Sequence, residues 1–387
     1  MYDELLSDKV KVLKPSGIRK FFDLAATKEG VISLGVGEPD FATPWHIREA
    51  AIYSIKAGKT FYTSNAGLLP LRQEICHYMK RRFDLSYDPN KNAIVTVGGS
   101  EAIDIALRAI INPGDEVILL QPCYVAYEPS VLLADGVPVF IELNDKNHFK
   151  LTVEQLEAAI TTKTKAIILN FPSNPTGGVM TYEDYEPLIP IFKKHNLVIL
   201  SDEIYAELSY SEKHCSPANF DEVKDLTIII SGFSKAFAMT GWRLGYLIAN
   251  ETFVQQMIKI HQYIIMSAPT AAQFGAIEAL RNGQKYVDEM VEQYQLRRNF
   301  IVKGFNRIGL PTHQPEGAFY IFPCIKSTGL TSLEFCEKLL DEQNVACVPG
   351  SAFGNAGEGY IRVSYAYSIE EIKAAIEKIG VFMKQYQ

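Results

Sequence analysis

Polar residues that could act together in chemistry follow four apolar runs of this 387-residue sequence. The runs are AIVTV, KAIILN, LVILS and LTIIIS, and the groups that follow them are Gly98-Gly99-Ser100, the loop 172–177 with Asn174, Asp202 with Tyr205, and Lys235. If the runs are parallel strands of one sheet, their carboxyl ends share an edge, and ligands of such sheets bind at that edge. We therefore expect these groups to form one site.

The turn Gly98-Gly99-Ser100 is a candidate phosphate site, because it opens a helical segment whose first N–H groups carry partial positive charge. Its spacing does not match GxGxxG, and GxxxxGK[ST] occurs nowhere in the chain, so a monophosphate fits better than a nucleotide. Arg243 can clamp a phosphate through two N–H groups, and Ser231 or Ser234 can donate a hydroxyl. Singly, these features also suit a tight turn and a surface arginine.

Asp202 and Lys235 supply the opposite charges of the predicted site. Asp202 follows an apolar run, so its carboxylate needs a cationic or hydrogen-bonding partner, unless it only caps a helix. Lys235 follows another run, although an isolated lysine is usually solvated. Jointly, a phosphate turn, a buried carboxylate, a tyrosine, an amide-bearing loop and a lysine match the needs of pyridoxal 5′-phosphate. The lysine forms a Schiff base, and the carboxylate keeps the ring nitrogen protonated.

The elements that must hold these residues alternate between strand-like and helical patterns from about residue 90. Short β-branched runs predict strands at 93–97, 116–120, 137–143, 165–170, 197–201 and 226–231. Amphipathic segments such as 100–110 separate them, so we expect an α/β fold with a mostly parallel sheet between helices. A long helix at 283–309, strands at 317–323 and 360–366 and further helices predict a smaller α+β domain.

These patterns divide the chain into an N-terminal arm that packs with the small domain (1–45), a large domain (46–284) and a small domain (285–387). The formal charge of −7, with both signs interspersed, argues against a nucleic-acid or anionic-membrane surface. No apolar run approaches the ~20 residues of a membrane span, and the start lacks a signal peptide's apolar centre, so we predict a cytoplasmic protein. The cysteines show no metal-ligand spacing, and no metal is expected.

With NFPSNPTGG, LSDEIYAELSY, SGFSKAFAMTGWRLGY and EGYIRVSYA in this order, the chain resembles the class I and II aminotransferases of the aspartate aminotransferase fold family. The likeness extends to SLGVGEPDF, YTSNAGLLPLR and PEGAFYIFP. The chain is most similar to the bacterial branch with aspartate, alanine, aromatic and N-acetyl-diaminopimelate aminotransferases. The resemblance implies the fold-type I architecture, bound pyridoxal 5′-phosphate, and ping-pong amino transfer between an L-amino acid and a 2-oxo acid.

The resemblance also implies roles for the residues that match the family's motifs. The implied cofactor contacts are Lys235 for the Schiff base, Asp202 for the pyridine nitrogen, Tyr205 and Asn174 for the 3′-oxygen, Tyr124 for ring stacking, and Gly99, Ser100, Ser234 and Arg243 for the phosphate. Arg362, with Asn174 and the backbone at Gly37, matches the substrate-carboxylate site. Tyr62 reaches the phosphate from a second subunit, which implies a homodimer.

Two departures and one rival reaction leave alternatives open. Many relatives have serine where this chain has Gly232, so the phosphate could meet Ser231 or Ser234. Some aspartate-specific relatives have lysine in place of Ser100, which weakens a strict aspartate assignment. Glutamate and 2-oxoglutarate, with aspartate, alanine or an aromatic amino acid, are the expected substrates. A pyridoxal-phosphate β-lyase on the same fold is the alternative.

Substrate choice depends on aromatic side chains whose placement the sequence does not decide. Such residues near the motifs could surround an apolar or aromatic substrate, or they could simply be core: Phe21, Phe22, Tyr62, Tyr124 and Phe319.

Overall fold

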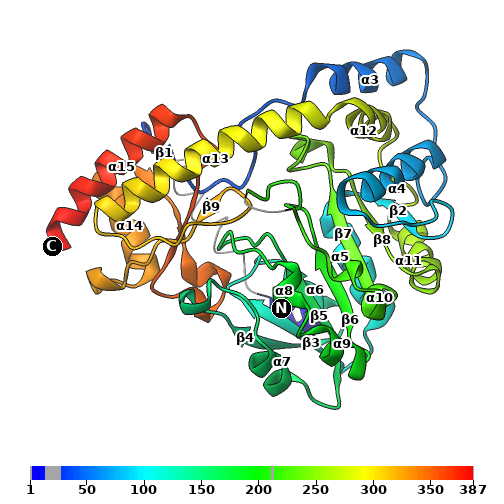
Figure 1. The fold of residues 1–387 in the computed structure, drawn as a ribbon, viewed down its shortest axis with the longest axis horizontal. Helices are drawn as coiled ribbons and strands as arrows, with labels where there is room; N and C mark the ends of the chain where they lie inside the picture. Colours follow the sequence, from blue (N-terminus) through cyan, green and yellow to red (C-terminus); the bar gives the residue numbers. More distant parts are fainter. Residues whose placement is uncertain (1, 14–27, 211–212, 387) are drawn as a thin grey trace.

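The computed structural model describes residues 2–13, 28–210 and 213–386 (Figure 1). Its centre is a seven-stranded sheet in the order β2-β8-β7-β6-β5-β3-β4. The strands are β2 (Ala93–Thr96), β3 (Glu116–Gln121), β4 (Val137–Glu142), β5 (Thr164–Asn170), β6 (Val198–Asp202), β7 (Thr227–Gly232) and β8 (Gly245–Ile248). Neighbouring strands are parallel except around β8, which runs antiparallel to β2 and β7. The sheet is therefore the mostly parallel one that the sequence predicts.

Strand β8 is the member of this sheet that the sequence pattern does not predict. Its run of four residues follows the Lys235 loop directly, and so short a run cannot be told from a buried loop by periodicity. The other strands begin and end within one residue of the predicted runs. These strands could be predicted because they are buried on both faces, and burial on both faces requires a continuous apolar sequence.

Helices cover both faces of the sheet, and alternate strand residues enter different cores. In β7, Ile228 and Ile230 pack with residues of α5 and α11, whereas Ile229 packs with residues of α4 and α12. The helices of this part are α3 (Trp45–Lys56), α4 (Leu69–Phe83), α5 (Gly98–Ile110), α6 (Tyr127–Leu133), α7 (Val153–Ala159), α8 (Tyr182–Tyr185), α9 (Ile189–Lys194), α10 (Asp221–Lys224), α11 (Glu251–Ile264) and α12 (Thr270–Asn282).

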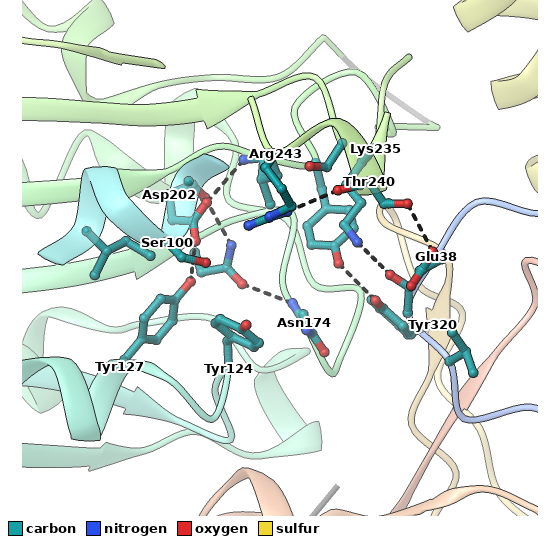
Figure 2. Close-up of a pocket in the computed structure, with 18 of the residues that line it drawn as sticks. Glu38, Ser100, Tyr124, Tyr127, Asn174, Asp202, Lys235, Thr240, Arg243 and Tyr320 are labelled. Atoms are coloured by element: carbon teal, nitrogen blue, oxygen red, sulfur yellow. Dashed lines mark hydrogen bonds between the residues drawn. The ribbon is translucent and has the colours of Figure 1, made fainter. Parts of the chain in front are cut away.

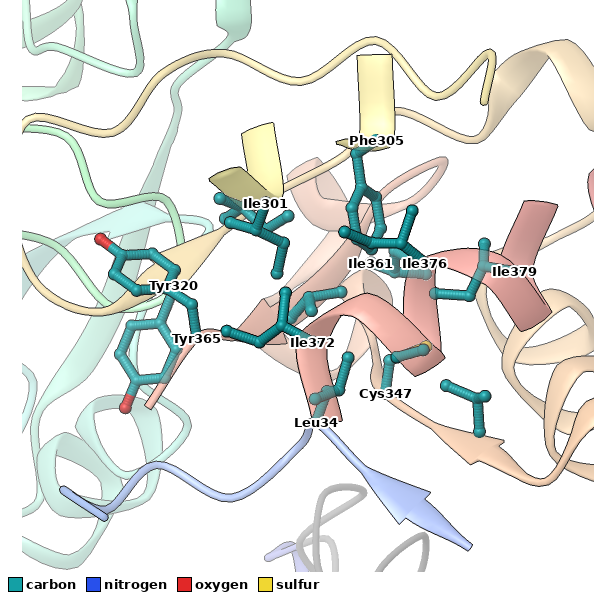
Figure 3. Packing of buried hydrophobic residues seen from close by; sticks show 14 of the residues in the cluster. Leu34, Ile301, Phe305, Tyr320, Cys347, Ile361, Tyr365, Ile372, Ile376 and Ile379 are labelled. Carbon is teal, nitrogen blue, oxygen red and sulfur yellow. The ribbon is translucent and has the colours of Figure 1, made fainter. Parts of the chain in front are cut away.

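The long helix α13 (Gln284–Arg307) leads from this layer structure into the C-terminal part (Figure 1). That part has its own apolar core, which α13 and α15 line with Ile301, Phe305, Ile372 and Ile376 (Figure 3). Its elements are β9 (Tyr320–Ile321), α14 (Ser332–Gln343), β10 (Val345–Ala346), β11 (Val348–Pro349), β12 (Ile361–Ser364) and α15 (Ile369–Met383). Strands β11, β12 and β9 form an antiparallel sheet.

The strand predicted at 317–323 is reduced to β9, for a local steric reason. Ala318 has a left-handed backbone, with φ of 56°, which interrupts an extended run. At Gly317, an added Cβ would lie 2.5 Å from the Cβ of Pro172, so the chain turns closely against the loop 172–177. The turn brings the C-terminal part against the large sheet.

The N-terminal segment contacts both parts of the molecule. β1 (Ile32–Ser33) pairs in parallel with β10, and Leu34 enters the C-terminal core. The first short helix, α1 (Asp8–Lys11), contacts α6 instead, and Lys9 pairs with Asp135 at 2.6 Å. Residues 14–27 of the predicted arm, with Phe21 and Phe22, lie outside the described residues. Within the described ranges, no helix is both long and apolar enough to cross a membrane.

Candidate active site

A cavity of about 650 Å³ lies at the carboxyl ends of β5, β6 and β7 (Figure 2). Residues of the N-terminal segment and of the C-terminal part complete its wall. It is lined by these residues singled out from the sequence: Gly37, Gly99, Ser100, Tyr124, Asn174, Asp202, Tyr205, Ser234, Lys235, Arg243 and Arg362. Groups that are far apart in sequence therefore share one site, as the strand-end argument predicts.

Lys235 follows β7 and reaches across the cavity to the N-terminal segment. Its Nζ donates to the backbone oxygen of Gly37 at 2.5 Å and lies 5.8 Å from the centre of the Tyr205 ring. Burial lowers the pKa of Lys235 to about 8, against a partly opposing effect of the Glu38 carboxylate. A buried amine with such a pKa is available in its neutral, nucleophilic form near neutral pH.

Asp202 is the last residue of β6 and points its carboxylate into the same cavity. It accepts hydrogen bonds from two neutral donors, the hydroxyl of Tyr127 at 2.6 Å and the N–H of Ile204 at 3.2 Å. Burial raises the pKa of Asp202 to about 6, although both hydrogen bonds lower it. A carboxylate in this position would be stabilised by a cationic N–H group of a ligand.

The first turn of α5 and Arg243 form a concave backbone site at one end of the cavity. Gly98 has φ of +76°, and a Cβ there would lie 2.7 Å from a guanidinium nitrogen of Arg243. A Cβ on Gly245 would lie 2.6 Å from the carbonyl carbon of Gly98. Close approach of two backbone segments and an arginine therefore requires glycine at both positions. The arrangement suits an anion at the helix N-terminus.

The two candidate serines differ in where they lie. Ser234 lines the cavity. Ser231 is buried in β7 and donates to the backbone oxygen of Glu203 at 3.2 Å. Only Ser234 of the two is placed to meet a bound anion.

Arg362, in β12, is held by two distant segments. One Nη donates to Asn174 Oδ1 at 2.9 Å and the other to the backbone oxygen of Gly35 at 2.6 Å, while Nε is buried without a partner. The guanidinium also lies 4.5 Å from the centre of the Tyr320 ring. A buried guanidinium with an unused donor is suited to a ligand carboxylate.

Two tyrosines of the site are missing from the sequence-based candidates. Tyr127 starts α6, one turn after Tyr124, and bonds to Asp202. Tyr320 lines the cavity and shares a 2.8 Å hydrogen bond with Tyr205, whereas Phe319, the candidate named instead, is fully buried against the Tyr205 ring. No local signal separates Tyr320 from Phe319, because both are buried and both rings pack against Tyr205.

Tyr62 is the predicted site residue that does not line this cavity. It is 80% exposed and lies in the loop between α3 and α4. The side chain is thus presented to the outside of this chain.

Comparison with known proteins identifies relatives along nearly the whole chain. The family model "Aminotransferase class I and II" matches residues 29–379. An aspartate aminotransferase of Pyrococcus abyssi and an aromatic-amino-acid aminotransferase of Thermococcus litoralis are each 44% identical over 98% of this chain and 98% of their own. The structure matches an aspartate aminotransferase of Thermus thermophilus with a TM-score of 0.93 and 37% identity, covering 97% of this chain and 99% of that chain.

Proposed function

The chain belongs to the aminotransferase class I and II family, and we propose that it uses pyridoxal 5′-phosphate to exchange an amino group between an L-amino acid and a 2-oxo acid. Its architecture is the fold-type I α/β fold of these enzymes. The observation that carries the proposal is the pair of Lys235 and Asp202 in one buried cavity. Burial depresses the pKa of Lys235 and raises that of Asp202, so more of the lysine is neutral amine near neutral pH than it would be in water, and the carboxyl has no cation paired with it in the described residues.

The donors and acceptors of the cavity fit the cofactor group by group. The first N–H groups of α5 at Gly99 and Ser100, with Ser234 and Arg243, suit the phosphate. Asp202 suits the protonated ring nitrogen. Tyr124 suits stacking on the ring, and the remaining amide donors of Asn174 with the hydroxyl of Tyr205 suit the 3′-oxygen. When bound, the cofactor supplies an electrophilic carbon and an electron-withdrawing ring.

Residues of the chain itself bind the substrate and move the proton in the proposed reaction. Arg362, with Asn174 and the backbone at Gly37, binds the α-carboxylate and turns the substrate Cα–H toward Lys235. The neutral Nζ of Lys235 would take the Cα proton and hold it beside the bound cofactor, which would supply the electron-withdrawing ring. The carbonyl of Gly37 orients Nζ before the substrate enters.

Tyr62 supports a homodimer in which each chain completes the other's site. The Tyr62 side chain is exposed in its own chain. Its loop is joined to α12 by a hydrogen bond from Thr270 Oγ1 to the backbone oxygen of Phe61, at 2.8 Å. Apolar side chains on the adjoining elements are exposed as well, including Phe61, Tyr53 and Tyr263. A second copy that covers this face would bury them and bring Tyr62 to the phosphate.

We also propose a cytoplasmic location for the protein, as the sequence predicts.

Glutamate with 2-oxoglutarate, and aspartate, alanine or an aromatic amino acid, are the proposed substrates. The lysine and arginines that line the cavity in the described residues are Lys235, Arg243 and Arg362, and each already has a role above. Among the described residues that line the cavity, a second substrate carboxylate would therefore need a donor other than a further arginine. A panel of amino acids, each tested for loss of the bound cofactor's visible absorbance in one half-reaction, separates these substrates.

Replacement of Lys235 tests the proposed function directly. Lys235→Ala should still bind the cofactor through the phosphate and ring contacts, but it should lose transamination by at least about 10⁴-fold, because it lacks both the covalent link and the proton carrier. Borohydride should fix the cofactor to Lys235 of the wild type, as read by peptide mass, and not to the variant. The exposed Lys259→Ala serves as the control. Wild-type turnover by Lys235→Ala would refute the proposal.

A further inference from the structure

A buried acid and a buried histidine lie behind the proposed phosphate site, and the reaction described above uses neither. Glu101 stands in the first turn of α5 and His261 in the last turn of α11, and their side chains are 8% and 0% exposed. Nδ1 of His261 lies 2.5 Å from Oε1 of Glu101. The two residues thus join the helix that opens the phosphate site to the helix packed behind it.

The second oxygen of Glu101 holds the backbone just before that site. Val97 is the N-cap of α5, with φ of −79° and ψ of 70°, and its side chain makes no capping bond. The Val97 N–H donates to Oε2 of Glu101 at 2.5 Å. Glu101 therefore fixes the turn from behind, while the next N–H groups, which have no partner within the helix, remain available to a ligand.

The same histidine connects to the loop that carries Tyr62. Its backbone oxygen accepts from the N–H groups of Ile265 and Met266, at 2.9 and 3.1 Å, where α11 ends. The backbone oxygen of Met266 then accepts from Nδ2 of Asn65 at 2.7 Å. The backbone at His261 thus ends α11 beside the Tyr62 loop, while its side chain contacts only the α5 side, through Glu101.

Packing of α5 on α11 does not by itself explain a polar pair here. Burial removes the carboxylate and the imidazole from water, and two apolar side chains would avoid that cost. Nε2 of His261 is also buried without a hydrogen-bond partner, and this adds to the free-energy cost of burying the pair. What an apolar pair cannot do is accept the hydrogen bond of Val97.

We propose that Glu101 and His261 are positioning residues for phosphate binding. His261 orients the carboxylate, and the carboxylate holds the Val97 N–H so that the first free N–H groups of α5 face the phosphate. This inference rests on the proposed function, because it requires a phosphorylated cofactor. It implies that loss of the pair weakens the phosphate contacts and leaves those to the ring unchanged.

The test compares pyridoxal 5′-phosphate with pyridoxal, which lacks the phosphate, by titration of each into the cofactor-free full-length protein. Glu101→Leu removes both hydrogen bonds at similar side-chain size. Its dissociation constant for pyridoxal 5′-phosphate should rise about tenfold or more, whereas that for pyridoxal should change less than about twofold. Glu101→Gln is the matched control, because its amide can accept from Val97 and donate to His261, and it should stay within about threefold of wild type.

A second pair of variants addresses the histidine. His261→Leu should behave like Glu101→Leu, and His261→Asn, whose amide nitrogen can stand where Nδ1 stands, should behave like wild type. Equal losses for both ligands, no loss, or a loss in Glu101→Gln as large as in Glu101→Leu would overturn the inference. If neither leucine variant folds by circular dichroism, the pair serves the fold and the inference also fails. A wild type that binds neither ligand would instead refute the proposed function.

Discussion

Asp202 and Glu203 are neighbours at the end of β6, and both are buried, yet their surroundings differ. Asp202 faces the cavity and receives hydrogen bonds from Tyr127 and the Ile204 N–H. Glu203 points away from the cavity, where Ser201 and Ser216 donate to Oε1 at 2.8 and 2.5 Å. Nε2 of His214 lies 3.1 Å from its Oε2, close enough for an ion pair though not aligned as a hydrogen bond.

The difference shows that burial alone does not identify a functional acid. Glu203 has two hydroxyl donors at Oε1 and an imidazole beside Oε2, so we assign it to the stability of the fold behind the site. Asp202 has two neutral donors and, among the described residues, no ion-pair partner, and burial raises its pKa to about 6. A cationic ligand nitrogen would supply the positive charge that these neutral donors do not.

Substitution of Asp202 should give the largest effect on activity. Asp202→Asn keeps the shape but would not pair with the protonated ring nitrogen of the proposed cofactor, so we expect kcat/KM for transamination to fall about 10³-fold. The thermal midpoint of the cofactor-free protein should not fall, because the variant removes a buried charge. Steady-state kinetics measures the change in kcat/KM, and thermal unfolding measures the change in the midpoint. An Asp202→Asn enzyme with near-wild-type kcat/KM would show that the comparison of the two acids is wrong.

Substitution of Glu203 should reverse the pattern. Glu203→Leu leaves the buried hydroxyls of Ser201 and Ser216 without their acceptor and His214 without its acidic neighbour, so the protein should lose about 3 kcal/mol of stability. The kcat of the protein that remains folded should change less than about fivefold. Glu203→Gln, which retains acceptor capacity, is the control and should lose less stability. A Glu203→Leu variant that is stable but inactive would assign Glu203 to the chemistry.

The pH dependence of the cofactor-free protein sharpens the comparison further. The folded state keeps a proton on Asp202 up to about pH 6, whereas the unfolded chain releases it near the ordinary value of 3.8. Between about pH 4 and 6 the folded state therefore binds more protons, and stability falls as the pH rises, by up to about 3 kcal/mol. Thermal midpoints of wild type and Asp202→Asn should diverge over this window and run parallel above it. Parallel curves throughout would contradict the proposed environment of Asp202.

The sheet could be predicted from the sequence because its strands are buried on both faces. A run such as 226–231 must then be continuously apolar, and the polar group that follows must lie at the sheet's edge. Strand β8 and the shortening of β9 could not be predicted in this way. They depend on long-range contacts, such as Gly245 against Gly98 and Gly317 against Pro172, that leave no local period in the sequence.

Some residues of the candidate site could likewise be predicted from the sequence, and others could not. Residues of recognisable motifs, such as Lys235, Asp202 and Arg362, could be named from the sequence, and the structure brings them into one cavity. Tyr127 and Tyr320 could not, because a tyrosine in an apolar segment is ordinarily core. Their roles become visible only when the hydroxyl is seen to bond with Asp202 or Tyr205.

The guanidinium of Arg362 has a consequence for anyone who recombines homologous genes. It is fixed by Asn174 and by Gly35, which are 188 and 327 positions away in the chain. A single crossover between positions 35 and 362 takes Arg362 from one parent and at least one of its two supports from the other. Chimaeras of this enzyme should therefore inherit residues 35, 174 and 362 from the same ancestor.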